Sequence, residues 1–369
     1  MPGNFKKYYF LFPFAVIYWL IVIIRNKLFD IHILPEKEFN IPIISVGNIT
    51  VGGTGKTPHI EYLIRILKRD FNIATLSRGY KRKTRGFILS TIDSKSTEIG
   101  DEPRQLKYKF PNTHIAVSER RVKGIEKLIK QINNLDAVLL DDAYQHRYVK
   151  AGINILLIDF NRIITKDYLL PVGRLREPSY EMHRASIIII TKCPQEIKPI
   201  EKRIIQKEIN PFPFQKLFFT TYSYQNIEPV FVDKSEELGF DYPAIENHCV
   251  MLITGIANSG PIKNYISKLA KQIIELKFSD HHNFVKKDIE KIINTFRSIN
   301  CEQKLILTTE KDAVRLKNTN QFPEEIENQF YYLPIEVKFL FNEQDEFISQ
   351  ILNYVQKNKK HSIISQKQV

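Results

Sequence analysis

The stretch SVGNITVGGTGKTPHIEYL, residues 45–63, contains the residue types of a phosphate-binding loop. In the pattern G-x-x-x-x-G-K-[ST], Gly55, Lys56 and Thr57 match, and Thr50 stands in place of the first glycine. That glycine starts the turn without contacting phosphate, so its replacement changes the shape of the loop more than its chemistry. The alternative is a glycine-rich strand-to-helix turn that binds no ligand.

The glycines allow backbone N–H groups to turn inward around phosphate oxygens where the following helix begins. Lys56 would then reach the β- and γ-phosphates of ATP, and the Thr57 hydroxyl would bind Mg²⁺. The nucleotide-binding residues expected from this loop are Thr50, Val51, Gly52, Gly53, Thr54, Gly55, Lys56 and Thr57.

A second candidate element is LDAVLLDDAYQHR, an apolar run that ends in Asp141 and Asp142. Carboxylates at a strand end are hard oxygen ligands that suit magnesium, so this pair is the expected metal site. The same acids could instead cap the next segment. Gln145 and His146, which follow, could position a substrate or bond to nearby backbone.

Short apolar runs that alternate with amphipathic stretches must position these residues. IPIISVGN, NIATLSRGY, LDAVLLDD, INILLIDF and ASIIIITK read as strands, and HIEYLIRILKRDF reads as a helix. Continuous apolar runs indicate strands covered on both faces, which predicts an α/β fold of the P-loop NTPase type, with a mostly parallel sheet flanked by helices. Ligand sites in such sheets lie at the carboxyl ends of the strands, where both candidate elements fall.

Changes in residue composition and apolar pattern along the chain predict four parts. They are an N-terminal membrane-associating helix (1–30), a P-loop core (31–212), a smaller C-terminal α/β domain (213–350) and a frayed basic tail (351–369). The second boundary is placed where NPFPFQKLFF becomes aromatic and proline-rich.

The N-terminal part is an uncharged run, YYFLFPFAVIYWLIVII, with lysine or arginine on both sides. It is slightly shorter than the ~20 apolar residues of a straight membrane span. Its tyrosines and tryptophan and its basic flanks favour a helix in or on an anionic membrane face, and a buried helix of a soluble core is the alternative. The formal net charge of +13 also predicts an anionic partner. No nucleic-acid-binding motif is present, so nucleic acid is not the partner expected.

The three cysteines, Cys193, Cys249 and Cys301, lie far apart and form no C-x-x-C pair. Neither a disulfide framework nor a zinc site is therefore expected, and a reducing cytosolic setting is the plain interpretation.

Nine motifs together resemble the tetraacyldisaccharide 4′-kinase family, the lipid A 4′-kinases of Gram-negative bacteria. In chain order they are SVGNITVGGTGKTP, SRGYKR, GDEP, VSERR, DDAYQHR, LLPVGRLREP, TGIANSGP, FSDHHNF and TTEKDAVRL. The resemblance implies transfer of the ATP γ-phosphoryl group to the 4′-hydroxyl of a tetraacylated glucosamine disaccharide 1-phosphate. It places the enzyme at the cytoplasmic face of the inner membrane, peripheral or monotopic, with no obligate protein partner. In this family Gly and Leu are more usual than Ala143 and Tyr144.

The same resemblance assigns roles to matching positions. Asp101 is the implied catalytic carboxylate, and His281 is the histidine that would pair with it as a base, completed when the second domain closes on the first. Arg121 and Arg176 would hold phosphate or the anionic group of the substrate, and Glu102 would approach the magnesium or the ATP phosphates. Sequence alone leaves contact between Asp101 and His281 open.

Three further positions keep two interpretations each. Glu177 would brace Arg176 or form a surface salt bridge. Arg78 and Tyr80 would contact the sugar or headgroup of the substrate, or lie in a solvated basic loop. For the whole chain, the alternative to a lipid kinase is a membrane-attached P-loop nucleotide switch or ATPase without a lipid substrate.

Overall fold

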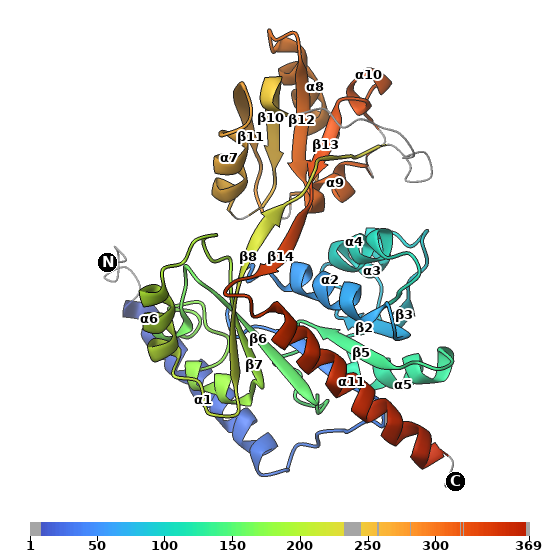
Figure 1. Ribbon diagram of the computed structural model, residues 1–369, viewed down its shortest axis with the longest axis vertical. Coiled ribbons are helices and arrows are strands. Elements are labelled where there is room, and N and C mark those ends of the chain that lie inside the picture. Colours follow the sequence, from blue (N-terminus) through green and yellow to red (C-terminus); the bar gives the residue numbers. More distant parts are fainter. Residues whose placement is uncertain are drawn as a thin grey trace. The chain divides into compact units, whose positions relative to one another are not determined.

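The computed structural model describes residues 9–231, 245–256, 258–280, 282–317, 319 and 321–366. The chain forms two compact units, shown in Figure 1: Met1–Tyr222 together with Val337–Val369, and Ser223–Glu336. The predicted boundary at 212/213 therefore lies too early. The aromatic, proline-rich stretch enters a strand of the large sheet, β8 (Lys216–Tyr224), because its apolar residues Phe218 and Phe219 are fully buried there.

The first unit contains the predicted α/β sheet. In the described part of the chain this sheet has nine strands in the order β14-β8-β7-β6-β1-β5-β2-β4-β3. Parallel pairs join β1 to β5 and β6, β2 to β4 and β5, and β7 to β6 and β8, whereas β3 is antiparallel to β4. The bounds are β1 (Ile43–Gly47), β2 (Ile73–Ser77), β3 (Ile88–Leu89), β4 (His114–Val117), β5 (Ala137–Asp141), β6 (Ile153–Asp159), β7 (Ile187–Thr191) and β14 (Ile335–Phe339).

Helices cover both faces of this sheet (Figure 1). They are α2 (Lys56–Leu67), α3 (Ser96–Ile99), α4 (Asp101–Lys109), α5 (Arg121–Gln131), α6 (Pro199–Ile209) and α11 (Gln344–Gln366). The strands expected from the apolar runs are buried along their whole length in β1, β2, β5 and β7. Burial on both faces is what a parallel sheet of this kind requires.

The frayed tail predicted for residues 351–369 is wrong over most of its length. Residues 351–366 continue helix α11, and the last three residues lie outside the described part of the chain. Phe347, Ile351 and Val355 repeat every four residues, so they share one helix face, and all three are fully buried in the core of the first unit. The polar and charged residues in the rest of the helix concealed this apolar stripe.

The second unit is the smaller α/β domain that the sequence predicts. Its described residues form a five-stranded sheet in the order β11-β10-β12-β13-β9, in which β9 alone is antiparallel to its neighbour. Its elements are β9 (Glu228–Pro229), β10 (Cys249–Thr254), β11 (Gln272–Lys277), β12 (Lys304–Thr309), β13 (Phe330–Leu333), α7 (Gly260–Ile266), α8 (Lys286–Ser298), α9 (Glu310–Lys317) and α10 (Glu324–Glu327).

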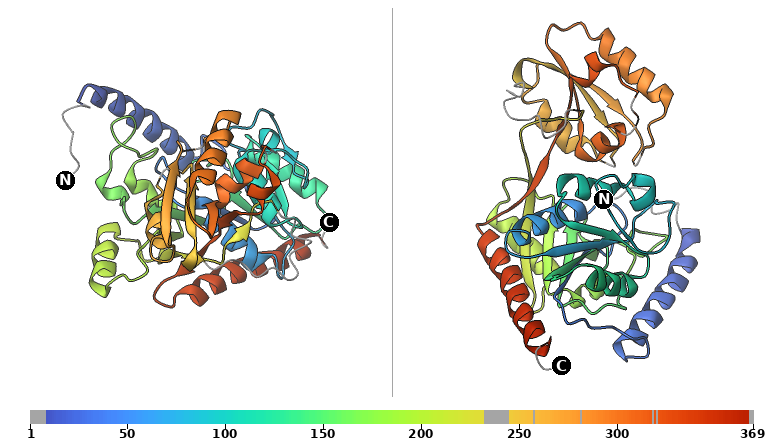
Figure 2. Two further views of the ribbon diagram at one scale, coloured as in Figure 1. Left: turned by 90° about the horizontal axis from the view of Figure 1, so that it is seen from above. Right: turned by 90° about the vertical axis from the view of Figure 1, so that its right-hand side faces the viewer.

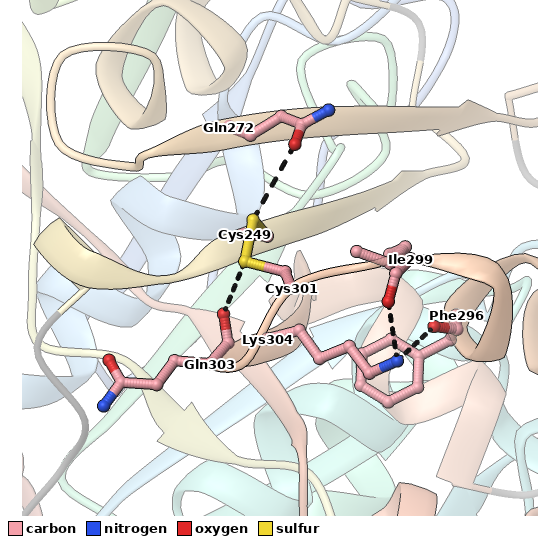
Figure 3. The surroundings of a disulfide bond; sticks show 7 residues. All are labelled: Cys249, Gln272, Phe296, Ile299, Cys301, Gln303 and Lys304. Atoms are coloured by element: carbon pink, nitrogen blue, oxygen red, sulfur yellow. Dashed lines mark hydrogen bonds between the residues drawn. A yellow bond between two sulfur atoms is a disulfide. The ribbon is translucent and has the colours of Figure 1, made fainter.

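One expectation about cysteine is wrong in this unit. Cys249 and Cys301 form a disulfide, shown in Figure 3, across a sequence separation of 52 residues. The pair is brought together because β10 lies beside β12, with Cys249 opposite Lys304 in the register. Sequence spacing did not reveal this neighbourhood. Cys193 is free and buried, and burial raises the pKa of its thiol to about 12.

Helix α1 (Phe12–Asp30) begins after a short 3-10 turn, η2 (Tyr9–Leu11). It is long and apolar enough to cross a membrane, and it buries only a narrow stripe against the first unit. A core helix would bury its large side chains, so the buried-helix alternative does not fit. The large apolar side chains of α1 that remain exposed are Phe12, Phe14, Val16, Ile17, Trp19, Leu20, Ile21 and Ile24.

Candidate active site

The glycine-rich loop connects the carboxyl end of β1 to the first residue of α2. Gly52 and Gly55 have positive φ angles of 106° and 88°, and Gly55 is the residue directly before the helix. Lys56 and Thr57 therefore occupy the first two helical positions, where backbone N–H groups have no partner inside the helix. This is the geometry that binds phosphate at a helix N-terminus.

Thr50 is part of a β-bridge, not of a tight turn. It is paired with Leu175 in antiparallel fashion, and the flanking bonds run from Val51 N to Arg174 O (2.8 Å) and from Arg176 N to Ile49 O (2.7 Å). A bridged position favours an extended, β-branched residue, which gives a physical reason for threonine where the usual pattern has glycine.

Side chains from neighbouring strand ends hold the rest of the loop. Asn48 Nδ2 donates to Thr54 Oγ1 (2.8 Å), and Thr191 Oγ1 donates to the backbone O of Thr54 (2.9 Å). Gln145 Nε2 donates to the backbone O of Asn48 (2.8 Å). Of the two interpretations of Gln145, the described contacts agree with bonding to nearby backbone.

Asp142 lies between two cations that the sequence had assigned separately. Lys56 Nζ is 3.4 Å from Asp142 Oδ1, and Arg176 Nη1 is 3.4 Å from Asp142 Oδ2. Burial by itself would raise the pKa of Asp142, but these two cations outweigh it and hold that pKa below its usual value. The carboxylate stays ionised and fixes both side chains at the end of the glycine-rich loop.

Asp141 lies in a different environment. It is 2% exposed, and burial, followed by the charges of Glu102 and Asp142, raises the pKa of its carboxyl group to about 7. Its Oδ1 atom is buried without a hydrogen-bond partner among the described residues. An unpaired buried carboxylate oxygen is unfavourable unless a cation or proton meets it.

Arg121 is almost fully buried beside these acids. Its guanidinium donates to the backbone O of Ser118 and, at 3.5 Å, to the backbone O of Asp141. Burial lowers the pKa of Arg121 to about 10, although Asp141 and Asp142 act in the opposite direction. The side chain therefore remains charged at neutral pH.

His146 is half-buried next to the same cations. Burial, together with the positive charges of Arg121 and Arg78, lowers the pKa of His146 to about 4. The imidazole is therefore neutral at physiological pH. Arg78 itself is exposed directly after β2, so it extends the positive side of the site toward solvent.

Asp101 and Glu102 are the first two residues of α4, and both are partly buried. The charge of Glu102 reaches Asp141, which places the two carboxylates near each other. Tyr80 is 66% exposed, and its backbone O lies 2.9 Å from the position that a Cβ on Gly100 would take. The SRGY and GDEP motifs therefore lie side by side.

Of the two interpretations of Glu177, the surface salt bridge is wrong, because Glu177 is 1% exposed. The ion pairs of Glu177 among the described residues are with other arginines. Its carboxylate accepts from Arg184 at 2.5 Å and lies 3.8 Å from Arg25 of α1. Burial raises the pKa of Glu177, and Arg184 opposes that shift. Nothing in the sequence indicated that Arg184, three residues before β7 begins at Ile187, was the partner.

The unusual Tyr144 is accommodated under the acidic pair. Its hydroxyl donates to the backbone O of Glu181 (2.7 Å), and the Arg184 guanidinium lies 4.4 Å from its ring centroid. A Cβ on Gly47 would lie 2.8 Å from Tyr144 Cβ, so β1 must end in glycine for this loop to pass.

Sequence reasoning missed a second group of polar residues beside the loop. Lys192 Nζ bonds to the backbone O of Gly53 and forms an ion pair with Asp159 (2.8 Å). These residues stand at the ends of β7 and β6, so the strand-end rule that located the other residues could have found them. A shallow surface hollow here is lined by Thr50, Val51, Gly52, Gly53, Thr54, Asp159, Arg162, Asp167 and Arg174.

His281 lies outside the described residues, so its predicted pairing with Asp101 stays a prediction. Its neighbour His282 is described, and its Nε2 lies 2.8 Å from Asp288 Oδ2. In the TTEKD motif, Asp312 accepts from Thr309 Oγ1 (2.7 Å) and from Gly255 N (2.8 Å). This aspartate therefore ties the start of α9 to the end of β10.

The residues at the loop fit a magnesium ion. Asp141 offers an unpaired carboxylate oxygen, and Thr57 offers a hydroxyl at the helix start. Across the residues that the structure describes, no three His, Cys, Asp or Glu side chains gather into a complete metal site. Magnesium does not need one, because it commonly takes one or two carboxylates, with water and substrate phosphates as its other ligands.

Comparison with known proteins agrees with these features. The family model described as tetraacyldisaccharide-1-P 4′-kinase matches residues 8–356. The tetraacyldisaccharide 4′-kinase of Bacteroides thetaiotaomicron is 46% identical over 375 residues, which cover 100% of this chain and 99% of the relative. The enzyme of the same name from Flavobacterium johnsoniae is 42% identical and covers 94% of this chain and 97% of its own.

A solved structure is similar across both units. The crystal structure of the "apo" form of LpxK from Aquifex aeolicus in complex with ATP has a TM-score of 0.71 and 27% identity, and the match covers 94% of this chain and 98% of that one. Together, the family match and the full-length relatives show that the chain belongs to the tetraacyldisaccharide 4′-kinase family.

Proposed function

We propose that the glycine-rich loop, the acidic pair and the two arginines around it form the site where this kinase phosphorylates its lipid. As a member of its family, the chain transfers a phosphoryl group to the 4′-hydroxyl of tetraacyldisaccharide 1-phosphate in lipid A biosynthesis. The observation that carries the assignment of the site is the grouping of Lys56, Asp142 and Arg176 at the first turn of α2.

ATP binding is supported by the loop geometry and by the ATP complex of the similar structure. The residues Thr50 to Thr57 would surround the phosphates with backbone N–H groups, and Lys56 would leave Asp142 to meet the β- and γ-phosphates. Lys192 and Arg162, beside Gly53 and Gly52, would add positive charge on the other side of the loop. Positioning and charge neutralisation are the main tasks in phosphoryl transfer.

Magnesium would be held by Thr57 and Asp141, and Asp142 and Glu102, whose charges act on Asp141, would contribute. When bound, the ion would neutralise charge on the phosphate oxygens. The raised pKa of Asp141 supports this assignment, because a carboxyl group that is hard to ionise alone becomes a good ligand once a cation is present.

Asp101 is the proposed base, with His281 as its partner. Asp101 would accept the proton of the sugar 4′-hydroxyl, either directly or through the histidine, as that oxygen attacks the γ-phosphorus. The place of Asp101 at the start of α4, next to the SRGY segment, supports a position facing the acceptor sugar.

Arg121, Arg176, Arg78 and Tyr80 are the proposed contacts of the anionic substrate. Arg78 and Tyr80 are exposed, so they are accessible to a headgroup, while buried Arg121 would act on transferred charge near the acids. His146 is neutral and could accept or donate a single hydrogen bond to the sugar. Gln145 and Glu177 have internal partners, and we propose that they support the site from behind.

The exposed apolar side chains of α1 support attachment to an anionic inner-membrane surface, where an acylated disaccharide stays.

The proposed activity is tested directly. Purified protein is incubated with ATP, magnesium and tetraacyldisaccharide 1-phosphate, and the mass of the lipid product is measured by mass spectrometry. A lipid product heavier by one phosphate is expected from wild type but not from Lys56→Ala. ATP hydrolysis without a heavier lipid would favour the nucleotide-switch alternative.

A further inference from the structure

Helix α6 has an exposed face that carries two large apolar side chains beside two cations. Ile200 and Ile204 are 59% and 57% exposed, and Arg203 and Lys207 are exposed beside them. Positions three and four apart share one side of a helix, so these four side chains form a single apolar and cationic face.

The opposite side of α6 is bound firmly to the first unit. Ile205 and Ile209 are buried in the core under β7 and β8, and Lys202 forms an ion pair with Glu343 (2.5 Å). The exposed face therefore belongs to a helix with a fixed orientation. Its two isoleucines are not needed to hold α6 in place.

Two exposed phenylalanines follow α6 in the chain. Phe212 and Phe214 are 48% and 65% exposed, and their rings stack with centroids 5.8 Å apart. Exposed aromatic rings next to cations are typical of proteins that lie in a membrane interface.

A continuous path of contacts joins α6 to α1. Glu208 of α6 accepts from Thr165 (2.6 Å) and Lys166 (2.8 Å), and the segment that follows pairs Tyr168 O with Leu175 N (2.9 Å). The next residue, Arg176, accepts from the Tyr18 hydroxyl of α1 through its backbone O (2.8 Å). Figure 1 and the left view of Figure 2 show α1 and α6 toward the same side of the first unit, and the left view separates them at the two ends of that side.

We propose that α6 and Phe212–Phe214 form a second membrane contact, which binds the anionic lipid surface together with α1. The α6 contact surface is defined as Ile200, Arg203, Ile204, Lys207, Phe212 and Phe214. Its isoleucines and phenylalanines would enter the boundary between headgroups and acyl chains, and its two cations would meet lipid phosphates. The charge complementarity and the shared side with α1 favour a bilayer over a protein partner.

Two contacts on one side would fix the enzyme's orientation, which a single helix cannot do. The Arg176 segment lies between α1 and α6 along the contact path, so the candidate active site would be held at the lipid surface where the acylated acceptor lies. This inference rests on the proposed membrane attachment and adds a second, separate surface to it.

The single tryptophan of the chain makes the contact measurable. Trp19 lies in α1 and reports on that helix alone. In a Trp19→Phe background, Ile204→Trp places the probe on α6, and Ile129→Trp places it on α5 as a matched exposed control. Vesicles are made of equal parts phosphatidylglycerol and phosphatidylcholine, with brominated acyl chains in one set.

Brominated vesicles should quench the probe at position 204 and leave the probe at 129 unchanged. A probe at 204 that remains unquenched while wild-type Trp19 is quenched would overturn the second contact and leave α1 attachment intact. The probe at position 204 is also measured without lipid at increasing protein concentration. A blue shift of its emission that grows with concentration would assign the surface to a second copy of the chain and would overturn the second membrane contact.

Binding and turnover give the second measurement on the full chain. Ile200→Ser with Ile204→Ser, and separately Arg203→Gln with Lys207→Gln, should each weaken vesicle binding about tenfold. On pure phosphatidylcholine vesicles, the variant with Arg203→Gln and Lys207→Gln should bind as wild type does. Turnover of substrate dispersed in detergent should stay at the wild-type value, because none of these residues is in the site. Ile129→Ser is the control.

Failure of the proposed function would look different. If wild type does not phosphorylate the lipid even in detergent, the activity assignment fails and the quenching result still stands. If detergent turnover is normal but both variants bind vesicles like wild type, the second contact is wrong.

Discussion

Lys56 Nζ and Asp142 Oδ1 lie 3.4 Å apart at the first turn of α2, and the same carboxylate also meets Arg176. The lysine of the glycine-rich loop is therefore held in place by a carboxylate of the acidic motif, which lies 86 positions later in the chain. Two cations share one ionised carboxylate, so positive charge remains for an incoming triphosphate. The arrangement keeps the lysine ordered before nucleotide arrives, which reduces the entropy lost on binding.

Lys56→Ala should lower kcat by at least about a hundredfold, because a cation next to the transferred charge is lost. Steady-state kinetics with detergent-dispersed lipid measures the effect, and circular dichroism checks that the fold remains. Lys68→Ala, at the exposed end of the same helix, is the control and should keep wild-type turnover. A Lys56→Ala enzyme with ordinary turnover would remove the loop from the mechanism.

Asp141→Asn should stabilise the nucleotide-free protein while it abolishes turnover. The folded pKa of Asp141 is raised to about 7 from 3.8, so its contribution to stability is fully present below pH 3.8 and is lost as the pH rises through 7. Above pH 7 the folded protein carries a buried charge that asparagine would remove. The melting temperature should rise by roughly a few degrees at pH 8 and by less at pH 5.

The measurement is thermal unfolding at both pH values in a chelating buffer, since bound magnesium would offset the same penalty. Asp136→Asn is the matched control: this aspartate precedes β5 and is paired with Lys359 (2.8 Å). An Asp141→Asn gain equal at the two pH values would contradict the raised pKa.

Asp101→Asn should reduce kcat by about a hundredfold or more while leaving the KM for ATP near its wild-type value, because asparagine keeps the shape but cannot accept a proton. Glu98→Gln, on the short helix just before, is the control. His281→Ala should show a similar loss if the two residues act as one unit, and the double variant should then lose little more than either single one. Independent, multiplicative losses would argue against a pair.

The parallel sheet was predictable because its strands are continuous runs of mostly apolar residues, as in IIIIT of β7, and the candidate site followed from the rule that ligands bind at carboxyl strand ends. The loop, Asp141 and Asp142 were found in this way. The partner of Glu177 was not, because Arg184 reaches it through a 3-10 turn, η4 (Ser179–Arg184), whose path no periodicity reveals.

Other failures have the same origin in long-range pairing. Cys249 and Cys301 meet only because β10 and β12 are neighbours, and strand order is not encoded in local spacing. The early domain boundary arose because β8 carries aromatic residues of linker-like appearance, although Phe218 packs in the core of the first unit. Helix α11 was not predicted because its buried residues Phe347, Ile351 and Val355 are spaced four apart among many polar and charged positions.

Glu61→Ala should uncouple the two helices that carry Lys56 and Asp101. Glu61 of α2 accepts from Gln105 Nε2 (3.0 Å) and Lys109 Nζ (2.6 Å) of α4, and it is buried. Removing one partner of a buried ion pair should lower the free energy of unfolding by about 3 kcal/mol. kcat should fall several-fold without change in the KM for ATP, since α4 loosens while the glycine-rich loop does not.

Urea unfolding and steady-state kinetics test that pair of effects. Glu126→Ala breaks an exposed ion pair with Lys37 and is the control, with an expected loss below about 0.5 kcal/mol. A Glu61→Ala protein that is less stable but turns over normally would show that the contact supports the fold alone.

Tyr18→Phe should separate membrane binding from catalysis. Tyr18 lies in α1 and donates to the backbone O of Arg176, so it links the apolar helix to the segment that carries this arginine and pairs with the loop at Thr50. Loss of one hydrogen bond of this kind is worth about 0.5–1.5 kcal/mol, which predicts a decrease in kcat of roughly two- to tenfold. Vesicle binding, followed by Trp19 emission, should not change, because the ring remains. Tyr148→Phe, whose half-exposed ring contacts Phe29 of the same helix, is the control. If Tyr18→Phe lowers turnover only on vesicles and in proportion to weaker binding, α1 acts as an anchor and does not position the site.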